Sequence, residues 1–162
     1  MLDVHAEDGM AMVALGDTLI TLWRDQPILS NWERHTIAVD ALATAHGEPI
    51  LLFHLILPSS TPPGHEARSK MQADLRRLGE KVRRMIVVPV GGSLWMNLVR
   101  PIVRTVLMLS GQAKRHAVAD SVEQGIMQVR AARGARTPRE RELRAGIAAL
   151  CDALGVDATV AA

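Results

Sequence analysis

The 162-residue sequence has little cysteine, few aromatic side chains and no long uncharged apolar run. Its one cysteine, Cys151, excludes an internal disulfide framework and a cysteine-rich zinc site, and it fits a reducing compartment. No stretch of about 18 residues is both uncharged and consistently apolar, so we expect no membrane insertion. Residues 1–8 are acidic instead of basic and then apolar, which argues against a secretory leader and for a cytoplasmic protein of bacterial type.

Side chains that could stack on nucleic-acid bases are scarce, because the chain has no tyrosine, one phenylalanine and three tryptophans. The net charge is +2, and the positive excess is local: residues 130–144 hold six arginines against two glutamates. No signature of a nucleic-acid-binding fold accompanies this cluster. We therefore interpret it as a solvated linker and helix start, and we predict no nucleic-acid partner.

Motifs for catalysis, cofactors and metals are missing as well. The sequence has no G-x-S-x-G, no G-x-x-x-x-G-K-[ST] and no H-E-x-x-H, and no two of its six histidines are four residues apart. We therefore predict no enzyme activity, no cofactor and no metal. His54 interrupts an apolar strand, where it is either a hydrogen-bonded core residue or part of a pocket lining.

The segments that are present alternate between strand and helix patterns. Residues 10–15 and 18–23 are short apolar runs separated by Gly16-Asp17, which suits a two-residue hairpin turn. The order of the elements predicts an α/β domain with a mixed sheet of about five strands, an N-terminal hairpin and helices packed on the sheet. The other predicted strands are 49–57, 85–90 and 115–119, and the predicted helices are 30–45, 65–81, 94–109, one from 120 and one from 137.

Three helix starts carry local signals. Ser30 and Glu33 have the spacing of a capping box, and so do residues 120 and 123. Pro138 suits the first position of a helix, where its missing N–H costs nothing.

We divide the chain into five parts: a flexible N-terminus (1–9), the α/β domain (10–130), a linker (131–136), an appended C-terminal helix (137–155) and a tail (156–162). The C-terminal helix presents a single narrow apolar stripe. The residues of this stripe are Leu143, Ile147, Leu150 and Leu154.

The order of elements, the loop after the central strand and the ending RHAVADSVEQGI at 115–126 resemble the sulfate-transporter and anti-sigma-factor-antagonist (STAS) family. The resemblance covers residues 10–130 and implies a regulatory, non-enzymatic interaction module. In STAS regulators a phosphorylatable serine follows the third strand. The matching residues are Ser59 and Ser60, where a helix N-terminus would favour a phosphate, although the Asp-x-Ser-Gly context is absent.

Residues 94–109 form an unusually apolar helix pattern. Their apolar side chains spread over more than half of a helical wheel, whereas a helix that lies on a core needs a stripe of about 100°. Arg100 and Arg104 keep one edge polar, and Pro101 predicts a kink or a break. The excess apolar surface requires a cover: the C-terminal helix of the same chain, the same surface of a second copy, or an apolar ligand or membrane.

We therefore predict a protein-interaction module, homo-oligomeric, that docks through the 94–109 helix, with the C-terminal helix covering that surface or contributing to it. The alternative prediction is a carrier or sensor of a small, lipid-like apolar ligand in a pocket beneath the helix. It draws on the similarity in shape between STAS-like and CRAL-TRIO lipid-transfer domains. The predicted interface or ligand residues are Leu94, Trp95, Leu98, Val99, Ile102, Val103, Val106, Leu143, Ile147, Leu150 and Leu154.

Overall fold

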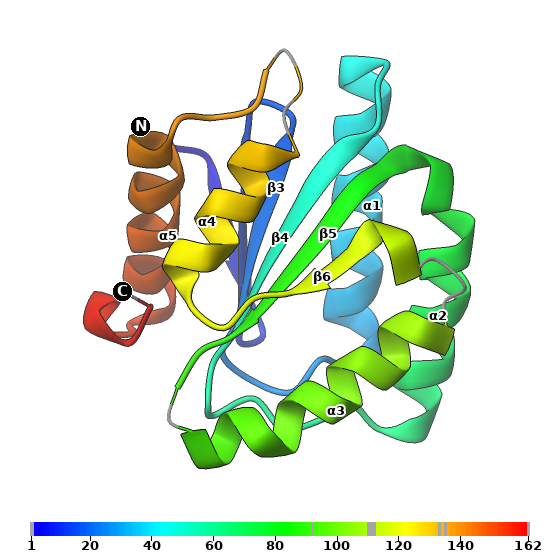
Figure 1. Cartoon of the computed structure of the whole chain (residues 1–162), viewed down its shortest axis with the longest axis vertical. Helices are drawn as coiled ribbons and strands as arrows, with labels where there is room; N and C mark the ends of the chain where they lie inside the picture. Colours follow the sequence, from blue (N-terminus) through cyan, green and yellow to red (C-terminus); the bar gives the residue numbers. More distant parts are fainter. Residues whose placement is uncertain (1, 92, 110–112, 133, 135, 162) are drawn as a thin grey trace.

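The computed structural model describes residues 2–91, 93–109, 113–132, 134 and 136–161, without the side chains of 93, 95, 96, 106, 109, 113, 160 and 161. The chain forms one sheet of six strands in the order of the sequence, with helices on both faces (Figure 1). The sheet is mixed, because its first three strands are antiparallel and the later ones run parallel. The predicted α/β class with a mixed sheet is confirmed.

The antiparallel part consists of β1 (Val4–Glu7), β2 (Met10–Leu15) and β3 (Thr18–Trp23). The predicted hairpin of residues 10–15 and 18–23 is present, and Gly16 takes a φ of 53° at its turn.

We did not predict β1. Residues 4–7 were assigned to a flexible N-terminus, and this assignment is wrong because they form a strand. This strand pairs with β2 through its backbone at the edge of the sheet, and none of its side chains is fully buried. An edge strand of this kind carries no apolar run that the sequence pattern could have revealed.

The parallel part consists of β4 (Ile50–Ile56), β5 (Val82–Pro89) and β6 (His116–Val118), each beside its predecessor. β5 begins three residues before the predicted strand. Its early residues Arg83 and Arg84 are half-buried, so they do not show as part of an apolar run.

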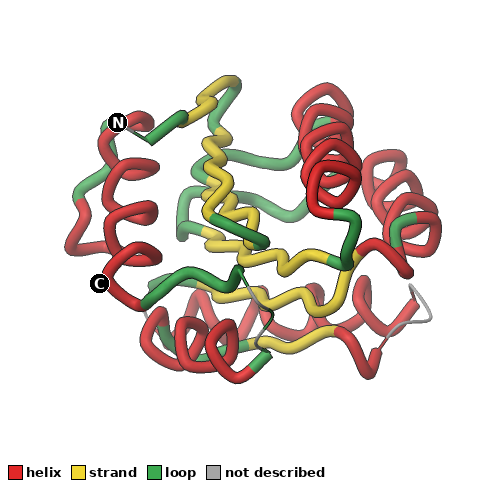
Figure 2. The backbone as a smooth tube through the Cα atoms, turned by 90° about the horizontal axis from the view of Figure 1, so that it is seen from above, coloured by secondary structure: helices red, strands yellow, loops and turns green. Residues whose placement is uncertain are grey.

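Three crossover helices connect the parallel strands: α1 (Leu29–His46), α2 (His65–Arg77) and α3 (Ser93–Leu109). Crossovers between parallel strands are right-handed in nearly all proteins, and these three advance in the same direction along the sheet. They therefore lie on the same face, where α2 packs against both α1 and α3. We call this the crossover face. Figure 2, which views the molecule from above, shows helices on either side of the strands.

The opposite face is covered by α4 (Val122–Ala131) and α5 (Glu140–Leu154) (Figure 1). α5 packs on β1, β2 and β3, and α4 packs on β4 and β5. We call this the terminal face. Short 3₁₀ helices occur at Gly79–Lys81, Ala113–Arg115 and Ala158–Ala161.

Side chains of each central strand alternate between the two faces, as the pleat requires. Leu51, Phe53 and Leu55 of β4 belong to the core of the terminal face. Ile50 and Leu52 of the same strand belong to the core of the crossover face. β4 is thus covered on both sides, which explains its continuous apolar sequence.

The predicted helix caps were displaced by one or two residues. α1 starts with Ile28 as its N-cap, and the backbone N–H of Ile28 donates to Oδ1 of Asn31 (2.9 Å). The predicted capping box of Ser30 and Glu33 is therefore wrong. The side-chain oxygen of Asn31, and not that of Glu33, accepts from the backbone N–H of the N-cap residue. In α4 the N-cap is Ser121, whose hydroxyl accepts from the backbone N–H of Gln124 (3.1 Å).

The predicted linker is held against the turn between β2 and β3, and α5 packs on the sheet. The backbone N–H of Asp17 donates to the carbonyl of Arg136 (3.3 Å), and the Asp17 carboxylate accepts from Arg83 (2.5 Å) and Thr137 (3.3 Å). Pro138 lies one residue before the N-cap, Arg139, and not in the first turn as predicted. The partners of the Asp17 carboxylate lie more than sixty residues away in the sequence, so no local sequence pattern indicates these contacts.

Candidate ligand-binding site

A cavity of about 90 Å³ lies on the crossover face, where the sheet meets α1, α2 and α3. Its sheet side is formed by Trp23 at the end of β3, His54 and Ile56 near the end of β4, and Met85 and Val87 of β5. The carboxyl ends of parallel strands are where α/β sheets most often bind ligands.

One face of α3 forms a second wall of the cavity. Val99, Ile102, Val103 and Leu107 recur at helical spacing and all line it. Three of these residues, Val99, Ile102 and Val103, belong to the predicted set, and Leu107 does not. Of the other predicted α3 residues, Leu94 and Leu98 lie on the exposed side, and the side chains of Trp95 and Val106 lie outside the described part.

We predicted a kink or a break at Pro101, and α3 runs through this residue without a break. Pro101 and Asn97, whose carbonyl loses its helical donor to the proline, are both exposed, so water can satisfy that carbonyl. An exposed proline therefore leaves the cavity-lining face of the helix continuous.

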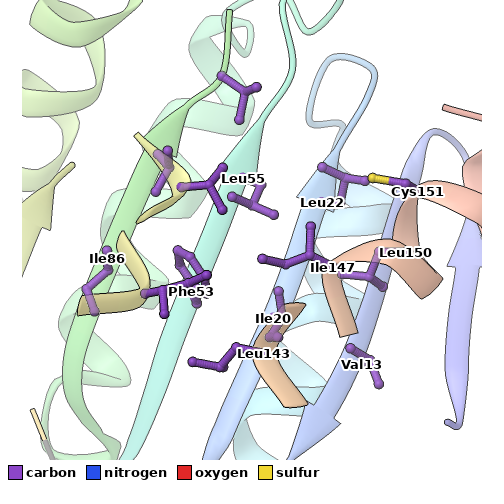
Figure 3. Packing of buried hydrophobic residues seen from close by; sticks show 14 of the residues in the cluster. Val13, Ile20, Leu22, Phe53, Leu55, Ile86, Leu143, Ile147, Leu150 and Cys151 are labelled. Atoms are coloured by element: carbon purple, nitrogen blue, oxygen red, sulfur yellow. The ribbon is translucent and has the colours of Figure 1, made fainter. Parts of the chain in front are cut away.

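The expected cover of α3 by the C-terminal helix is wrong. Leu143, Ile147, Leu150 and Leu154 are buried on the terminal face, across the sheet from α3. Figure 3 shows the first three beside residues of β2 to β4 such as Ile20 and Phe53. The apolar stripe of α5 fits any apolar surface, and the three crossovers leave one whole face of the sheet for it.

His54 is the most informative polar residue of the cavity. It is 3% exposed, and its Nδ1 accepts a hydrogen bond from the indole Nε1–H of Trp23 (3.0 Å). The Nε2 atom of His54 is buried and has no hydrogen-bond partner among the described residues. Both interpretations of His54 from the sequence therefore apply: it is a hydrogen-bonded core residue and it lines a pocket.

A second buried histidine, His35 of α1, lies against His54. The two rings meet edge to face with centroids 4.8 Å apart, and His35 stacks on Trp32 at 5.0 Å. Neither ring nitrogen of His35 has a partner among the described residues, and neither has the hydroxyl of Thr21, which is paired with His54 in the sheet. Unpaired polar atoms in such a cluster are rare in a protein core.

Burial keeps both histidines neutral. Burial lowers the pKa of His35 to about 4. Burial also lowers the pKa of His54 well below its usual range, and the neighbouring His35 and His116 lower it further. At neutral pH the two rings thus offer neutral donors and acceptors, and they carry no proton that could be transferred as an acid.

The loop after β4 closes the third side and is fastened in place. The hydroxyls of Ser59 and Ser60 donate to the carbonyls of Arg24 (2.6 Å) and Asp25 (3.0 Å). The side-chain amide of Gln26 donates to the carbonyl of Pro62 (2.6 Å). The cavity wall is therefore formed before any ligand arrives.

These contacts also bear on the predicted phosphorylation. Ser59 and Ser60 precede Gly64, the N-cap of α2, by several residues, so the expected placement at a helix N-terminus is wrong. Ser60 is 2% exposed and lines the cavity. Phosphorylation of Ser59 or Ser60 stays a prediction, and for Ser60 it would require the loop to open.

Trp23, Trp32, His35 and Met71 were not predicted as site residues. Trp32 and His35 are three residues apart on α1, a spacing that places them on one helix face, but the sequence does not show which strand that face meets. The contact between Trp23 and His54 spans 31 residues.

Within the described part of the chain, no group of three or more His, Cys, Asp and Glu side chains could hold a metal ion. The described helices include none with the length and hydrophobicity that a membrane crossing requires. No protein-family model matches the sequence, and comparison with curated proteins and with solved structures finds no match.

Proposed function

We propose that the protein binds a small, largely apolar molecule in the cavity between α3 and the sheet. The observation that carries this proposal is a preformed cavity whose lining is largely apolar and includes the buried side chain of His54. Ligand sites in proteins typically combine an apolar lining with a few polar groups of this kind.

The size of the cavity limits the ligand. An engineered cavity of about 150 Å³ holds benzene, and a single water needs only about 10–15 Å³. At about 90 Å³ this cavity suits a molecule of about five heavy atoms, or one end of a longer chain. Each buried methylene of such a ligand contributes on the order of 0.8 kcal/mol.

The test is binding of 2-methyl-1-butene, a five-carbon apolar probe. The methyl groups of Met71 and Met85, which line the cavity, serve as NMR reporters. We expect the two methyl resonances to shift on titration. Val103→Phe, which enlarges a lining side chain of α3, should weaken binding by tenfold or more because the ring occupies the cavity.

Leu98→Phe is the matched control, since it adds a ring to the exposed side of the same helix, where Leu98 is 65% exposed. It should leave the affinity unchanged, and circular dichroism should show both variants folded. Absence of shifts at Met71 and Met85 in the unsubstituted protein would contradict the proposed function.

A second candidate function is self-association through the outer side of α3, favoured by one observation. Leu94, Leu98 and Met108 are 79%, 65% and 69% exposed, and their spacing puts them on one stripe of the helix. If two copies meet there, light scattering gives a dimer mass that Leu98→Asp converts to a monomer. A monomer mass for the unsubstituted chain contradicts it. Membership of the STAS-like superfamily and a regulatory role stay predictions.

A further inference from the structure

A groove of about 350 Å³ lies beside the cavity, between α2 and α3. Its α3 side consists of Pro101, Ile102 and Thr105. Its α2 side is a single helix face, because its residues recur at spacings of three and four. These α2 residues are His65, Arg68, Ser69 and Gln72.

The groove and the cavity adjoin each other. Ile102 lines both of them and is only half-buried. On α2, Met71 lines the cavity and the next residue, Gln72, lines the groove. The cavity lining also includes the exposed residues Thr61 and Pro62, so the cavity reaches the surface near the start of α2. A chain that leaves the cavity past Ile102 therefore enters the groove.

The two pockets differ in charge. The described lining of the cavity includes no Asp, Glu, Lys or Arg, so a charged group would lose its water there without gaining a counter-ion. The groove contains the exposed Arg68, and its described lining includes no Asp or Glu. On the same helix, Asp74 pairs with Lys70 (2.9 Å), and Glu66 is two residues from Arg68 and thus on another helix face. The charge of Arg68 is therefore open to an anion in the groove.

The groove suits an oxygen anion in particular. A guanidinium group presents a planar set of donors that matches a carboxylate or a phosphate. Ser69 and Gln72 line the same side and carry further donors, a hydroxyl and an amide. The hydroxyl of Thr105, on the other side, donates to the carbonyl of Pro101 (2.8 Å) and is not free to do so. The head of a ligand is therefore expected on the α2 side.

Given the proposed function, we infer that the natural ligand is an anionic amphiphile whose apolar end occupies the cavity and whose carboxylate or phosphate head binds Arg68 in the groove. The chain of this ligand crosses Ile102, the residue that the two pockets share. Arg68 then determines the specificity for a charged head, and the cavity determines the specificity for an apolar end.

Two probes of equal length test this inference. Octanoate and octanamide have the same apolar chain, and the amide replaces the charged head by a neutral group of similar size. About five terminal carbons fill the cavity, and the rest of the chain crosses Ile102. We expect both probes to shift the methyl resonances of Met71 and Met85 and to displace 2-methyl-1-butene.

The role of the charge is tested at Arg68. Arg68→Gln should weaken octanoate binding by about fivefold, the upper end of what an exposed ion pair contributes, and leave octanamide binding unchanged. Arg104→Gln is the matched control, because it removes the same charge from an exposed position of α3 that lines neither the cavity nor the groove. It should leave both dissociation constants unchanged, and circular dichroism should show both variants folded.

A second measurement needs no substitution. With ¹⁵N-labelled arginine, we expect octanoate to shift the Nε–H resonance of Arg68 and octanamide to leave it nearly in place. Octyl phosphate, titrated in the same way, distinguishes the two kinds of head. If Arg68→Gln weakens the binding of only one of the two anions, the natural ligand carries that head.

The outcomes separate the two proposals. If octanoate and octanamide both shift Met71 and Met85 but Arg68→Gln weakens neither anion, the inference is wrong and the proposed cavity function stands. If octanoate shifts the Arg68 resonance but neither methionine, the head and the chain do not share one site, and the inference is also wrong. If 2-methyl-1-butene and both eight-carbon probes leave the methionines unshifted, the proposed function fails, and the inference fails with it.

Discussion

The two faces of the sheet differ in how completely they are filled. On the terminal face, the side chains of α4 and α5 pack against those of β2 to β5 in an apolar core (Figure 3), and the buried hydroxyl of Thr18 on this face donates to the Asp17 carboxylate (3.2 Å). The crossover face buries Thr21, His35 and His54 among apolar side chains and keeps a cavity beside them. A filled apolar core contributes stability, whereas a cavity and buried polar atoms without a partner among the described residues lower it.

The largest expected effect is a loss of stability on replacing leucine by alanine, which we compare between the two faces. Leu150→Ala on α5 should lower the free energy of unfolding by about 2–5 kcal/mol, because Leu150 is fully buried in the terminal core. Leu107→Ala on α3 should cost less, because Leu107 lines the cavity and lacks contacts on that side. Urea unfolding of both variants measures the difference. Equal losses would mean that the two faces are filled alike.

The second expected effect is a pH dependence that belongs to the crossover face. His35 takes up its proton at a pKa of about 4 when folded and near 6.5 when unfolded. Between these values the unfolded chain binds more protons, so stability is full above pH 6.5 and falls as the pH falls towards 4. The loss is on the order of 3 kcal/mol. The lowered pKa values of His54 and His116 act in the same direction.

The matched variant for this effect is His35→Leu, which replaces a buried ring without a hydrogen-bond partner among the described residues by an apolar side chain of similar size. It should leave stability at neutral pH unchanged or higher, and it should flatten the fall of stability below pH 6.5. Urea unfolding across the pH range tests this. An unchanged pH profile in His35→Leu would show that other groups cause the acid sensitivity.

The smallest expected effect tests how closely α4 approaches the sheet. A Cβ added at Gly125 would lie 2.7 Å from side-chain carbons of Phe53 and Val88, so Gly125→Ala should cost about 1–3 kcal/mol. Gly64→Ala, before α2 on the crossover face, meets no atom within 4 Å. It should change stability by less than about 0.5 kcal/mol. Thermal unfolding compares them, and a neutral Gly125→Ala would mean that the terminal face has room to spare.

Much of the fold could be predicted because it depends on local patterns. The hairpin at Gly16, the doubly covered β4 and the order of strands and helices all follow from turn chemistry and apolar periodicity. The candidate site was predicted in part: a pocket beneath the α3 helix was the alternative function, and His54 was named separately as a core or pocket residue, but the two were not placed together.

The sequence by itself determined the order of strands and helices, the hairpin turn at Gly16 and the apolar residues of the central strands. Only the tertiary structure decided what those residues are buried against. It placed the stripe of α5 on the terminal face, and it brought His35, His54 and Trp23 together from α1, β4 and β3. The physical reason is that apolar periodicity reports the loss of contact with water, which is the same for any partner, while the identity of the partner depends on contacts between residues far apart in the chain.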